Sequence, residues 1–409
     1  MKFTTKLLHG NVSPNAETGA TTPPIYQSAA FYQQSAAAME KIFSGKKPGF
    51  VYTRVNNPTI DYFERRMTLL EGGVGSVACS SGMAAVSLAV LNILKSGDEI
   101  VSGSGIFGGT YSFFNGLSAY GIKTNYAQKS TTTCFEKYIT ANTRLIFLET
   151  IGNPKLDVPD IKAFSQLAHK YHIPLIIDNT AATPYLIQPL KHGADIVVHS
   201  VSKFIDGGGN SIGGTIIDSG RFKWTEDKFP LIKNFTQYGP FCYLAKLRAG
   251  LFKDIGTCMA PLNAYLINLG LDTLSLRMER VCASANRLAS YLKNCSKIKA
   301  VNYPGLPENP DHETAKRQFG DKYGAILTIR VGTKEKAFTL IDNLKYALNA
   351  ANIGDSKTLV IHPASTIYAA DTEEQKANAG VYDDLIRICV GLEDIEDIEE
   401  DFKQALAKI

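Results

Sequence analysis

Short apolar runs alternate with helix-length segments along the chain from about residue 60 onward. Between the runs lie helical patterns such as Met83 to Leu94 and Ile161 to Tyr171. This alternation predicts βαβ units and a mainly parallel sheet. The runs expected to form its strands are Ser76–Cys79, Glu99–Ser102, Leu145–Leu148, Leu175–Ile177 and Ile196–Val198.

Composition and hydrophobic periodicity along the chain predict three parts. Residues 1–55 are rich in Gly, Pro, Thr and Ser with little periodicity, which indicates an extended arm that lies on a neighbouring subunit. Residues 56–245 form the large α/β domain and residues 246–409 a smaller C-terminal α/β domain. In the latter we expect a long helix, three strands and a closing amphipathic helix. Their ranges are Pro261–Leu292, then Ala325–Val331, Thr358–Ile361 and Leu385–Cys389, then Glu393–Lys408.

Composition and charge exclude several classes of protein. A net charge of +4 arises from 43 basic and 39 acidic side chains spread along 409 residues, so no basic block indicates nucleic acid or a membrane surface. The seven cysteines form no CxxC pair, which favours a reducing compartment, and the seven histidines lack metal-site spacing. Without a signal-peptide core or a run of about 18 apolar residues, we expect a cytoplasmic protein with no metal.

A carboxylate follows one predicted strand directly. Asp178 ends the run Pro174-Leu-Ile-Ile-Asp, at the edge where open α/β sheets bind ligands. Taken alone, an aspartate at such a position is more often a helix cap or a loop hydrogen-bond acceptor.

The next predicted strand runs out into two hydroxyls and an amine, in Ser200-Val-Ser202-Lys203. A single lysine after a strand is usually exposed. Here, however, the two hydroxyls can bind phosphate, and the glycine-rich stretch Gly207–Gly214 lets backbone approach a ligand closely.

A third anion site is predicted where a strand ends and a helix begins, in Cys79-Ser-Ser81-Gly82-Met83. Free N–H groups and the helix dipole attract phosphate there, although a plain serine N-cap explains the segment equally well. Lysine, strand-end aspartate and phosphate donors together match pyridoxal 5'-phosphate. The lysine forms a Schiff base, the carboxylate keeps the pyridine nitrogen protonated, and the donors anchor the phosphate.

A motif typical of dinucleotide-binding sites competes with this interpretation. Gly103-Ser-Gly105-Ile-Phe-Gly108 is GxGxxG directly after a predicted strand, as in a dinucleotide site. The acidic residue expected about 20 positions later is absent, because residues 122–128 read IKTNYAQ. A nicotinamide-dependent enzyme therefore stays as a distant alternative.

With these motifs the chain resembles the Cys/Met-metabolism family of pyridoxal-phosphate enzymes, of fold type I. The resemblance extends from Leu8-His-Gly-Asn to Gly391-Leu-Glu-Asp394. It implies a large, mostly parallel-sheet cofactor domain and a smaller C-terminal α/β domain. It also implies that Lys203 is the Schiff-base lysine and proton shuttle, and Asp178 the partner of the pyridine nitrogen. The residues implied to bind the phosphate are Ser81, Gly82, Met83, Ser200 and Ser202.

The resemblance assigns further residues to shared active sites. Tyr52 and Arg54, in a Tyr-x-Arg motif, would reach the phosphate of an adjacent subunit in a homotetramer. Without the family, both would be interface or surface residues. Asn153 would lie near the phenolic oxygen of the cofactor and contact substrate. Arg387 would clamp the substrate carboxylate with its two-pronged guanidinium, and Ser356 lies in the loop that fixes substrate.

One residue departs from the family pattern. Many members carry a tyrosine that stacks on the cofactor ring and helps the γ-leaving group to depart, and this chain has Phe107 there. Stacking is retained but the phenolic proton is lost. Because a general acid is missing, an easily expelled group such as acetate is favoured over a thiol.

Scaffold stretches of the chain are most similar to the O-acetylhomoserine sulfhydrylase branch, including Leu269–Met278 and Val301–Leu306. We therefore expect a γ-replacement that converts O-acetyl-L-homoserine and sulfide, or a related sulfur donor, to L-homocysteine and acetate. The alternatives are a γ-lyase acting on methionine or cystathionine, and a cystathionine γ-synthase. Scaffold residues identify a branch but do not determine its substrate.

Overall fold

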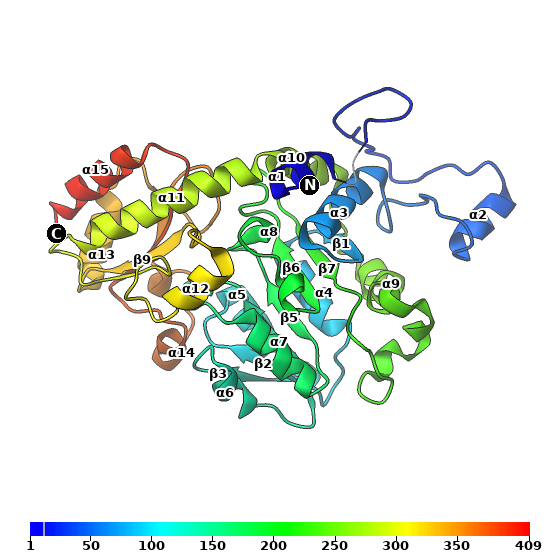
Figure 1. Ribbon diagram of the computed structural model, residues 1–409, viewed down its shortest axis with the longest axis horizontal. Coiled ribbons are helices and arrows are strands. Elements are labelled where there is room, and N and C mark those ends of the chain that lie inside the picture. The colour runs from blue at the N-terminus through cyan, green and yellow to red at the C-terminus, as the bar shows by residue number, and fades with distance from the viewer. Residues whose placement is uncertain (11–12) are drawn as a thin grey trace.

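The computed structural model describes residues 1–10 and 13–409. Asn11, which ends the first motif of the family resemblance, and Val12 lie outside the described residues. Figure 1 shows a central sheet flanked by helices, with the C-terminal part of the chain, yellow to red, on one side of it. The segment that carries α2 (Ala36–Phe43) extends on the other side.

The first sheet has seven strands in the order β1-β7-β6-β5-β4-β2-β3. The five strands from β3 to β6 in that order run parallel, and β7 is antiparallel to both of its neighbours. The predicted parallel sheet is therefore confirmed. Its strands are β1 (Gly75–Cys79), β2 (Glu99–Gly103), β3 (Lys123–Ala127), β4 (Thr143–Glu149), β5 (Leu175–Asp178), β6 (Ile196–Ser200) and β7 (Gly214–Asp218).

Helices cover both faces of this sheet (Figure 1). In α7 the buried side chains are Ile161, Phe164, Leu167 and Ala168, on the face that amphipathic spacing predicts, and the Asp160 carboxylate accepts a hydrogen bond from the first turn. The helices of this part are α3 (Pro58–Glu71), α4 (Gly82–Leu91), α5 (Gly108–Gly116), α6 (Thr132–Glu136), α7 (Ile161–Lys170), α8 (Thr183–Leu186) and α9 (Cys242–Ala249).

The second sheet has five strands in the order β10-β11-β12-β9-β8 and is mostly antiparallel. Its strands β9, β11 and β12 and its closing helix α15 match the predicted ones. The elements are β8 (Ala300–Asn302), α12 (His312–Phe319), β9 (Ile326–Arg330), α13 (Lys334–Asn343), β10 (Leu348–Asn349), β11 (Leu359–Ile361), α14 (Glu373–Asn378), β12 (Leu385–Cys389) and α15 (Ile395–Leu406).

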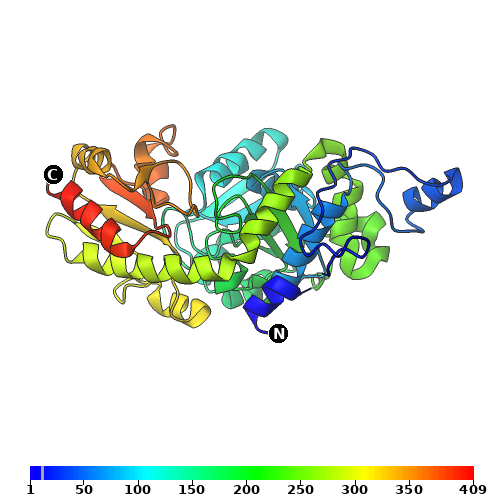
Figure 2. The same cartoon turned by 90° about the horizontal axis from the view of Figure 1, so that it is seen from above.

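The predicted boundary at position 245 falls inside α9, so no break in the secondary structure marks it. The long helix expected over 261–292 is two helices, α10 (Pro261–Asp272) and α11 (Leu274–Lys293), separated at Thr273. α10 packs on α3 of the first part, and α11 runs across to the second sheet (Figures 1 and 2). Apolar spacing continues through Thr273, so the pattern alone does not reveal the break.

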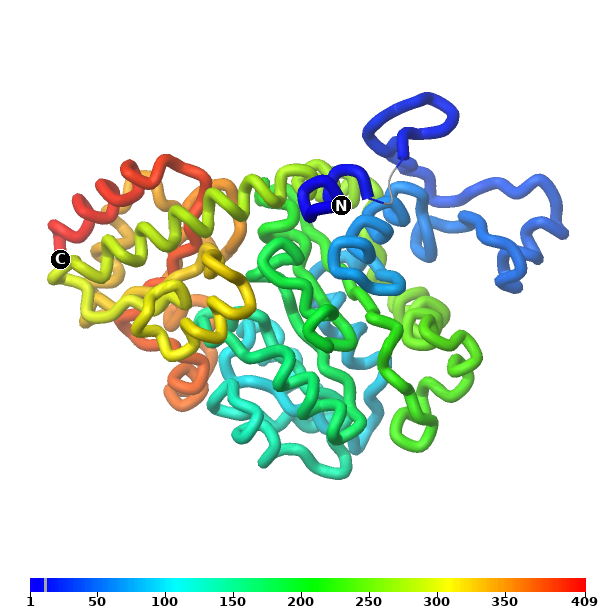
Figure 3. The backbone as a smooth tube through the Cα atoms, viewed as in Figure 1, coloured from blue at the N-terminus to red at the C-terminus, as the bar shows by residue number. Residues whose placement is uncertain are grey.

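The N-terminal segment is not one continuous coil. α1 (Phe3–His9) packs on the body of its own chain, where Leu7 is buried and its carbonyl accepts a hydrogen bond of 2.9 Å from Arg66 Nη2. α2 (Ala36–Phe43) has no buried residue and projects from the body, as the tube in Figure 3 shows. Leu7 therefore anchors the first ten residues on the body, whereas the segment that carries α2 projects from it.

Candidate active site

A cavity of about 740 Å³ opens at the carboxyl ends of β4, β5 and β6, beside the start of α4. Residues of the second sheet and its loops complete the wall, so both parts of the chain contribute. Its volume suits a small-molecule ligand. The cavity brings together these predicted site residues: Ser81, Gly82, Met83, Phe107, Asn153, Asp178, Ser200, Ser202, Lys203 and Arg387.

Lys203 lies in the turn that follows β6, with its amine directed into the cavity. The Nζ atom donates a hydrogen bond to the Asn352 side-chain oxygen. Burial lowers the pKa of the Lys203 amine, and the charge of Arg387 lowers it further. Both effects favour the neutral amine, which is the form that can attack a carbonyl or remove a proton.

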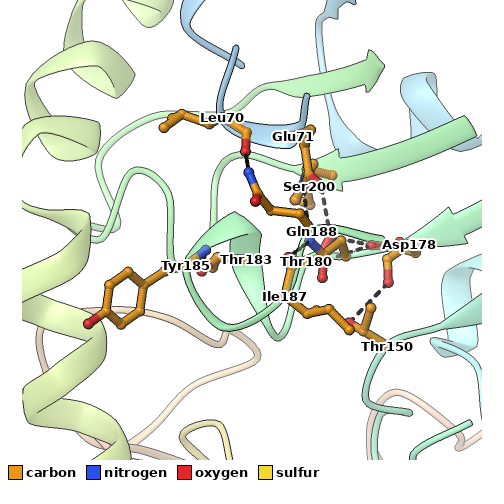
Figure 4. A network of polar contacts seen from close by, with 12 residues as sticks. Leu70, Glu71, Thr150, Asp178, Thr180, Thr183, Tyr185, Ile187, Gln188 and Ser200 are labelled. Atoms are coloured by element: carbon orange, nitrogen blue, oxygen red, sulfur yellow. Dashed lines mark hydrogen bonds and ion pairs between the residues drawn. The ribbon is translucent and has the colours of Figure 1, made fainter. Parts of the chain in front are cut away.

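Asp178 is the last residue of β5 and lines the same cavity. Its Oδ1 atom accepts hydrogen bonds from the backbone N–H of Thr180, at 2.9 Å, and from the Thr180 hydroxyl. That hydroxyl also accepts the Ser200 backbone N–H at 2.8 Å, so β5 and β6 are tied together beside the carboxylate (Figure 4). Burial raises the pKa of Asp178, which the two Thr180 hydrogen bonds and the charge of His199 oppose.

The start of α4 forms a second polar end of the cavity. The Ser81 hydroxyl accepts a hydrogen bond of 3.0 Å from Ala84 N. The same first turn carries the N–H groups of Gly82 and Met83, which the start of a helix leaves without intrahelical partners. Gly82 lies close against Ser200, since a Cβ added to it would come within 2.5 Å of the serine Cβ. This end of the cavity therefore combines a helix N-terminus with a serine, as an anion site requires.

The two serines differ in what their hydroxyls contact. Ser202 Oγ donates to the Gly213 carbonyl at 3.1 Å and accepts its N–H at 2.9 Å. Among the residues that the structure describes, the Ser200 hydroxyl has no hydrogen-bond partner, so its proton is available to a ligand. Ser200 is thus the stronger candidate to donate a hydrogen bond to a ligand, because the Ser202 hydroxyl already donates to the Gly213 carbonyl.

Arg387 is a buried cation on β12, with 4% of its surface exposed. It donates to Asn153 Oδ1 at 3.0 Å and to the Asn352 carbonyl at 3.1 Å. Within residues 1–10 and 13–409 no carboxylate pairs with it, although an unpaired buried charge is costly. The arrangement fits an anionic ligand group that supplies the missing charge.

Phe107 lines the cavity just before α5, and its backbone N–H donates to Glu149 Oε1 at 2.7 Å. Burial, followed by the charge of Asp178, raises the pKa of Glu149 well above its usual range. Glu149 ends β4, and its carboxyl group fixes the backbone that presents the Phe107 ring.

Among the cavity residues that the sequence analysis does not predict, three form hydrogen bonds to predicted site residues: Glu149, Thr180 and Asn352. The strand-end rule that identified Asp178 applies equally to Glu149 at the end of β4. Thr180 follows Asp178 by two positions, a spacing typical of a hydroxyl that binds a carboxylate locally. Asn352 lies in the same loop as Ser356, and no sequence signal distinguishes the two.

Three predicted residues lie elsewhere in the chain. Ser356 does not line the cavity, and its hydroxyl contacts Asp355 Oδ1 at 3.3 Å. Tyr52 and Arg54 border a separate cavity of about 320 Å³, and the Arg54 guanidinium contacts the Lys253 carbonyl. These two residues therefore do not reach the main cavity of their own chain.

The competing glycine motif has a packing explanation. A Cβ on Gly105 would come within 2.6 Å of the Asp157 carboxylate and 2.9 Å of the Lys155 side chain. Gly105 is therefore required by these close neighbours, and none of the three glycines of the motif lines the main cavity, although Phe107 within the motif does. Over the described part of the chain, no cluster of three or more metal-ligating side chains occurs, and no helix could span a bilayer.

Comparisons with known proteins agree with this geometry. The family model for Cys/Met metabolism PLP-dependent enzymes matches residues 4–407. An O-acetyl-L-homoserine sulfhydrylase from Leptospira meyeri is 41% identical, over 98% of this chain and 96% of that protein.

Two solved structures are similar in fold along the whole chain. A putative O-acetylhomoserine (thiol)-lyase from Campylobacter jejuni, crystallised with a pyridoxyl-lysine phosphate, has a TM-score of 0.94 at 34% identity, covering 100% of both chains. A cystathionine γ-lyase from Lactobacillus plantarum has a TM-score of 0.88 at 31% identity, covering 100% of this chain and 99% of that one. The predicted fold type I class is thereby confirmed.

Proposed function

The chain belongs to the Cys/Met metabolism family of PLP-dependent enzymes, and within it we propose a γ-replacement of O-acetyl-L-homoserine by sulfide. The products are L-homocysteine and acetate. Support comes from the full-length similarity to sulfhydrylases and from the charges that line the cavity.

The cavity residues fit pyridoxal phosphate. Asp178 keeps Oδ2 free of hydrogen bonds from the described residues, and its buried carboxylate suits a protonated ring nitrogen. The first turn of α4 and the Ser200 hydroxyl suit the phosphate. Lys203 supplies the amine that bonds to the cofactor. When bound, the cofactor supplies an electron-accepting ring conjugated to the substrate nitrogen.

The protein's own residues orient the substrate and move its protons. Arg387 binds the substrate carboxylate with a charge-assisted hydrogen bond and so turns the amino acid toward Lys203. The Lys203 amine, once released by the incoming substrate, removes the α-proton and then shifts a proton at the β-carbon. The Phe107 ring would pack on the cofactor, and it has no proton to give to a leaving group.

One observation carries the choice of an acetyl ester. Lys203 and Arg387 are the only cationic side chains among the described residues that line the cavity. Lys203 would be bonded to the cofactor until the substrate releases it and would then act as an uncharged base, while the substrate carboxylate engages Arg387. A succinyl or phosphoryl leaving group would bring a further negative charge without a partner in this chain, whereas an acetyl group is neutral.

Product analysis tests the proposal. Cofactor-loaded protein is given O-acetyl-L-homoserine with and without sulfide, and methionine in a parallel reaction, and homocysteine and 2-oxobutyrate are quantified. We expect homocysteine that depends on sulfide and little turnover of methionine. Rapid 2-oxobutyrate formation that sulfide does not change would instead establish a γ-lyase. Preference for O-succinyl-L-homoserine and cysteine would establish a cystathionine γ-synthase.

We further propose a cytoplasmic homotetramer in which the arm of one subunit completes the site of another. Tyr52 and Arg54 do not line the main cavity of their own chain, and Tyr52 is 46% exposed. The Arg54 guanidinium would then supply the cation that the phosphate end of the cavity lacks. Seven free thiols are compatible with a reducing compartment.

Subunit mixing measures this sharing of sites. Arg54→Ala and Lys203→Ala proteins are each expected to be nearly inactive. After unfolding and refolding together, they should regain activity, because mixed dimers contain one site with both wild-type residues. A mixture no more active than its components would show that Arg54 acts within its own chain or not at all.

A further inference from the structure

The turn that carries Lys203 is held from outside the cavity by an arginine of the long helix. Arg277 lies in the first turns of α11, and its guanidinium reaches the two residues that follow Lys203. Nη1 donates to the Phe204 carbonyl at 2.5 Å, and Nη2 donates to the Ile205 carbonyl at 3.0 Å.

The same guanidinium is anchored at the junction of α10 and α11. Nη2 also donates to the Gly270 carbonyl at 2.7 Å, and Nε donates to the Thr273 hydroxyl at 3.1 Å. No ion pair joins Arg277 to a carboxylate within the described ranges. Burial lowers the pKa of Arg277 to about 10, which the charge of Asp206 opposes. A partly buried guanidinium that binds four neutral oxygens contributes to the geometry of the turn more than to charge neutralisation.

The backbone around the turn is shaped to admit this side chain. Gly207 has φ +69°, and a Cβ on it would come within 2.0 Å of Arg277 Nη1. A Cβ on Gly270 would come within 1.9 Å of the Asp206 carbonyl. On the other side, a Cβ on Gly354 would come within 2.4 Å of Phe204 N. The turn is therefore clamped between the α10–α11 junction and the loop that carries Asn352.

We propose that Arg277 is a positioning residue, which fixes the turn after β6 so that the Lys203 amine points at the reacting atoms. It never touches a ligand, since it does not line the cavity. The inference rests on the proposed function only in requiring Lys203 to be the lysine that binds the cofactor.

Loss of the guanidinium leaves two buried carbonyls without partners. Phe204 and Ile205 are 2% and 1% exposed. Each unpaired buried carbonyl is costly, so the turn shifts to find new partners and carries the Lys203 backbone with it. A shift of about 1 Å at a reacting group can cost on the order of 100-fold in rate.

The test compares Arg277→Met, which keeps the stem but has no donors, with Arg277→Lys, which can satisfy one carbonyl. Arg280→Met is the matched control, because Arg280 lies one turn along α11 and binds the Glu393 carbonyl and Asp394 instead. Two experiments are done with each protein. The first measures the rate at which cofactor-free protein captures pyridoxal phosphate, with the captured cofactor trapped on Lys203 by borohydride. The second measures kcat and KM for the amino-acid substrate.

We expect Arg277→Met to slow capture and to lower kcat by about 10- to 100-fold while KM changes by less than about threefold. Arg277→Lys should lie between Arg277→Met and the control. A lower melting temperature with capture and kcat equal to the Arg280→Met control would overturn the proposal. If Arg277→Met does not fold, the Arg277→Lys values decide in the same way. Capture needs no amino-acid substrate, so a wrong reaction assignment would leave this readout intact.

Discussion

Replacing Lys203 with alanine is expected to lower kcat by at least about 1,000-fold, because the amine that moves the protons at the α- and β-carbons of the substrate is removed. The variant should still bind pyridoxal phosphate through the first turn of α4 and Asp178, but without a covalent bond. Its visible spectrum should therefore resemble that of the free aldehyde. The rate of homocysteine formation and the absorption spectrum measure both effects.

The control for this variant is Lys191→Ala, which removes an exposed lysine distant from the cavity. It should leave activity and spectrum unchanged. If Lys203→Ala retained a tenth or more of the wild-type rate, Lys203 would not be the proton-transfer group.

Replacing Arg387 with alanine is expected to lower kcat/KM for the amino acid by about 100- to 1,000-fold, the cost of removing one partner of a buried, charge-assisted pair. The effect should fall mainly on the KM for O-acetyl-L-homoserine, with the KM for sulfide unchanged, because sulfide has no carboxylate. Steady-state kinetics with each substrate varied separates the two constants.

Arg330→Ala is the matched control, since Arg330 lies on the neighbouring strand β9 and pairs with Asp384 outside the cavity. It should leave both KM values near those of the wild type. A rise in the KM for sulfide equal to that for the amino acid would show that Arg387 shapes the whole cavity and does not select the carboxylate.

The strand-end rule accounts for most of what the sequence could predict about the site. Apolar runs identified β5 and β6, and parallel strands place their carboxyl ends at one edge, so Asp178 and Lys203 were expected close together. The proposed phosphate end follows from the physics of a helix N-terminus after β1. Motif resemblance was needed for Arg387 and Asn153, because nothing local marks an arginine in a strand as a ligand group.

Other features cannot be predicted from sequence patterns, because tertiary contacts determine them. β3 has a polar, partly exposed sequence, KTNYA, and forms only because β2 offers an unpaired edge. Asn352 enters the cavity and Ser356 does not, a difference set by the path of one loop. Arg277 reaches the Lys203 turn from a helix more than 70 positions along the chain, a contact that no spacing rule predicts.

The most direct test of a reaction centre built on Lys203 is to reduce the cofactor-loaded wild-type protein with borohydride and map the pyridoxyl group by peptide mass spectrometry. We expect the visible band to disappear and the added mass to lie on the peptide that contains Lys203, with no adduct in Lys203→Ala. A stable adduct on any other lysine, or none on Lys203, would contradict the account.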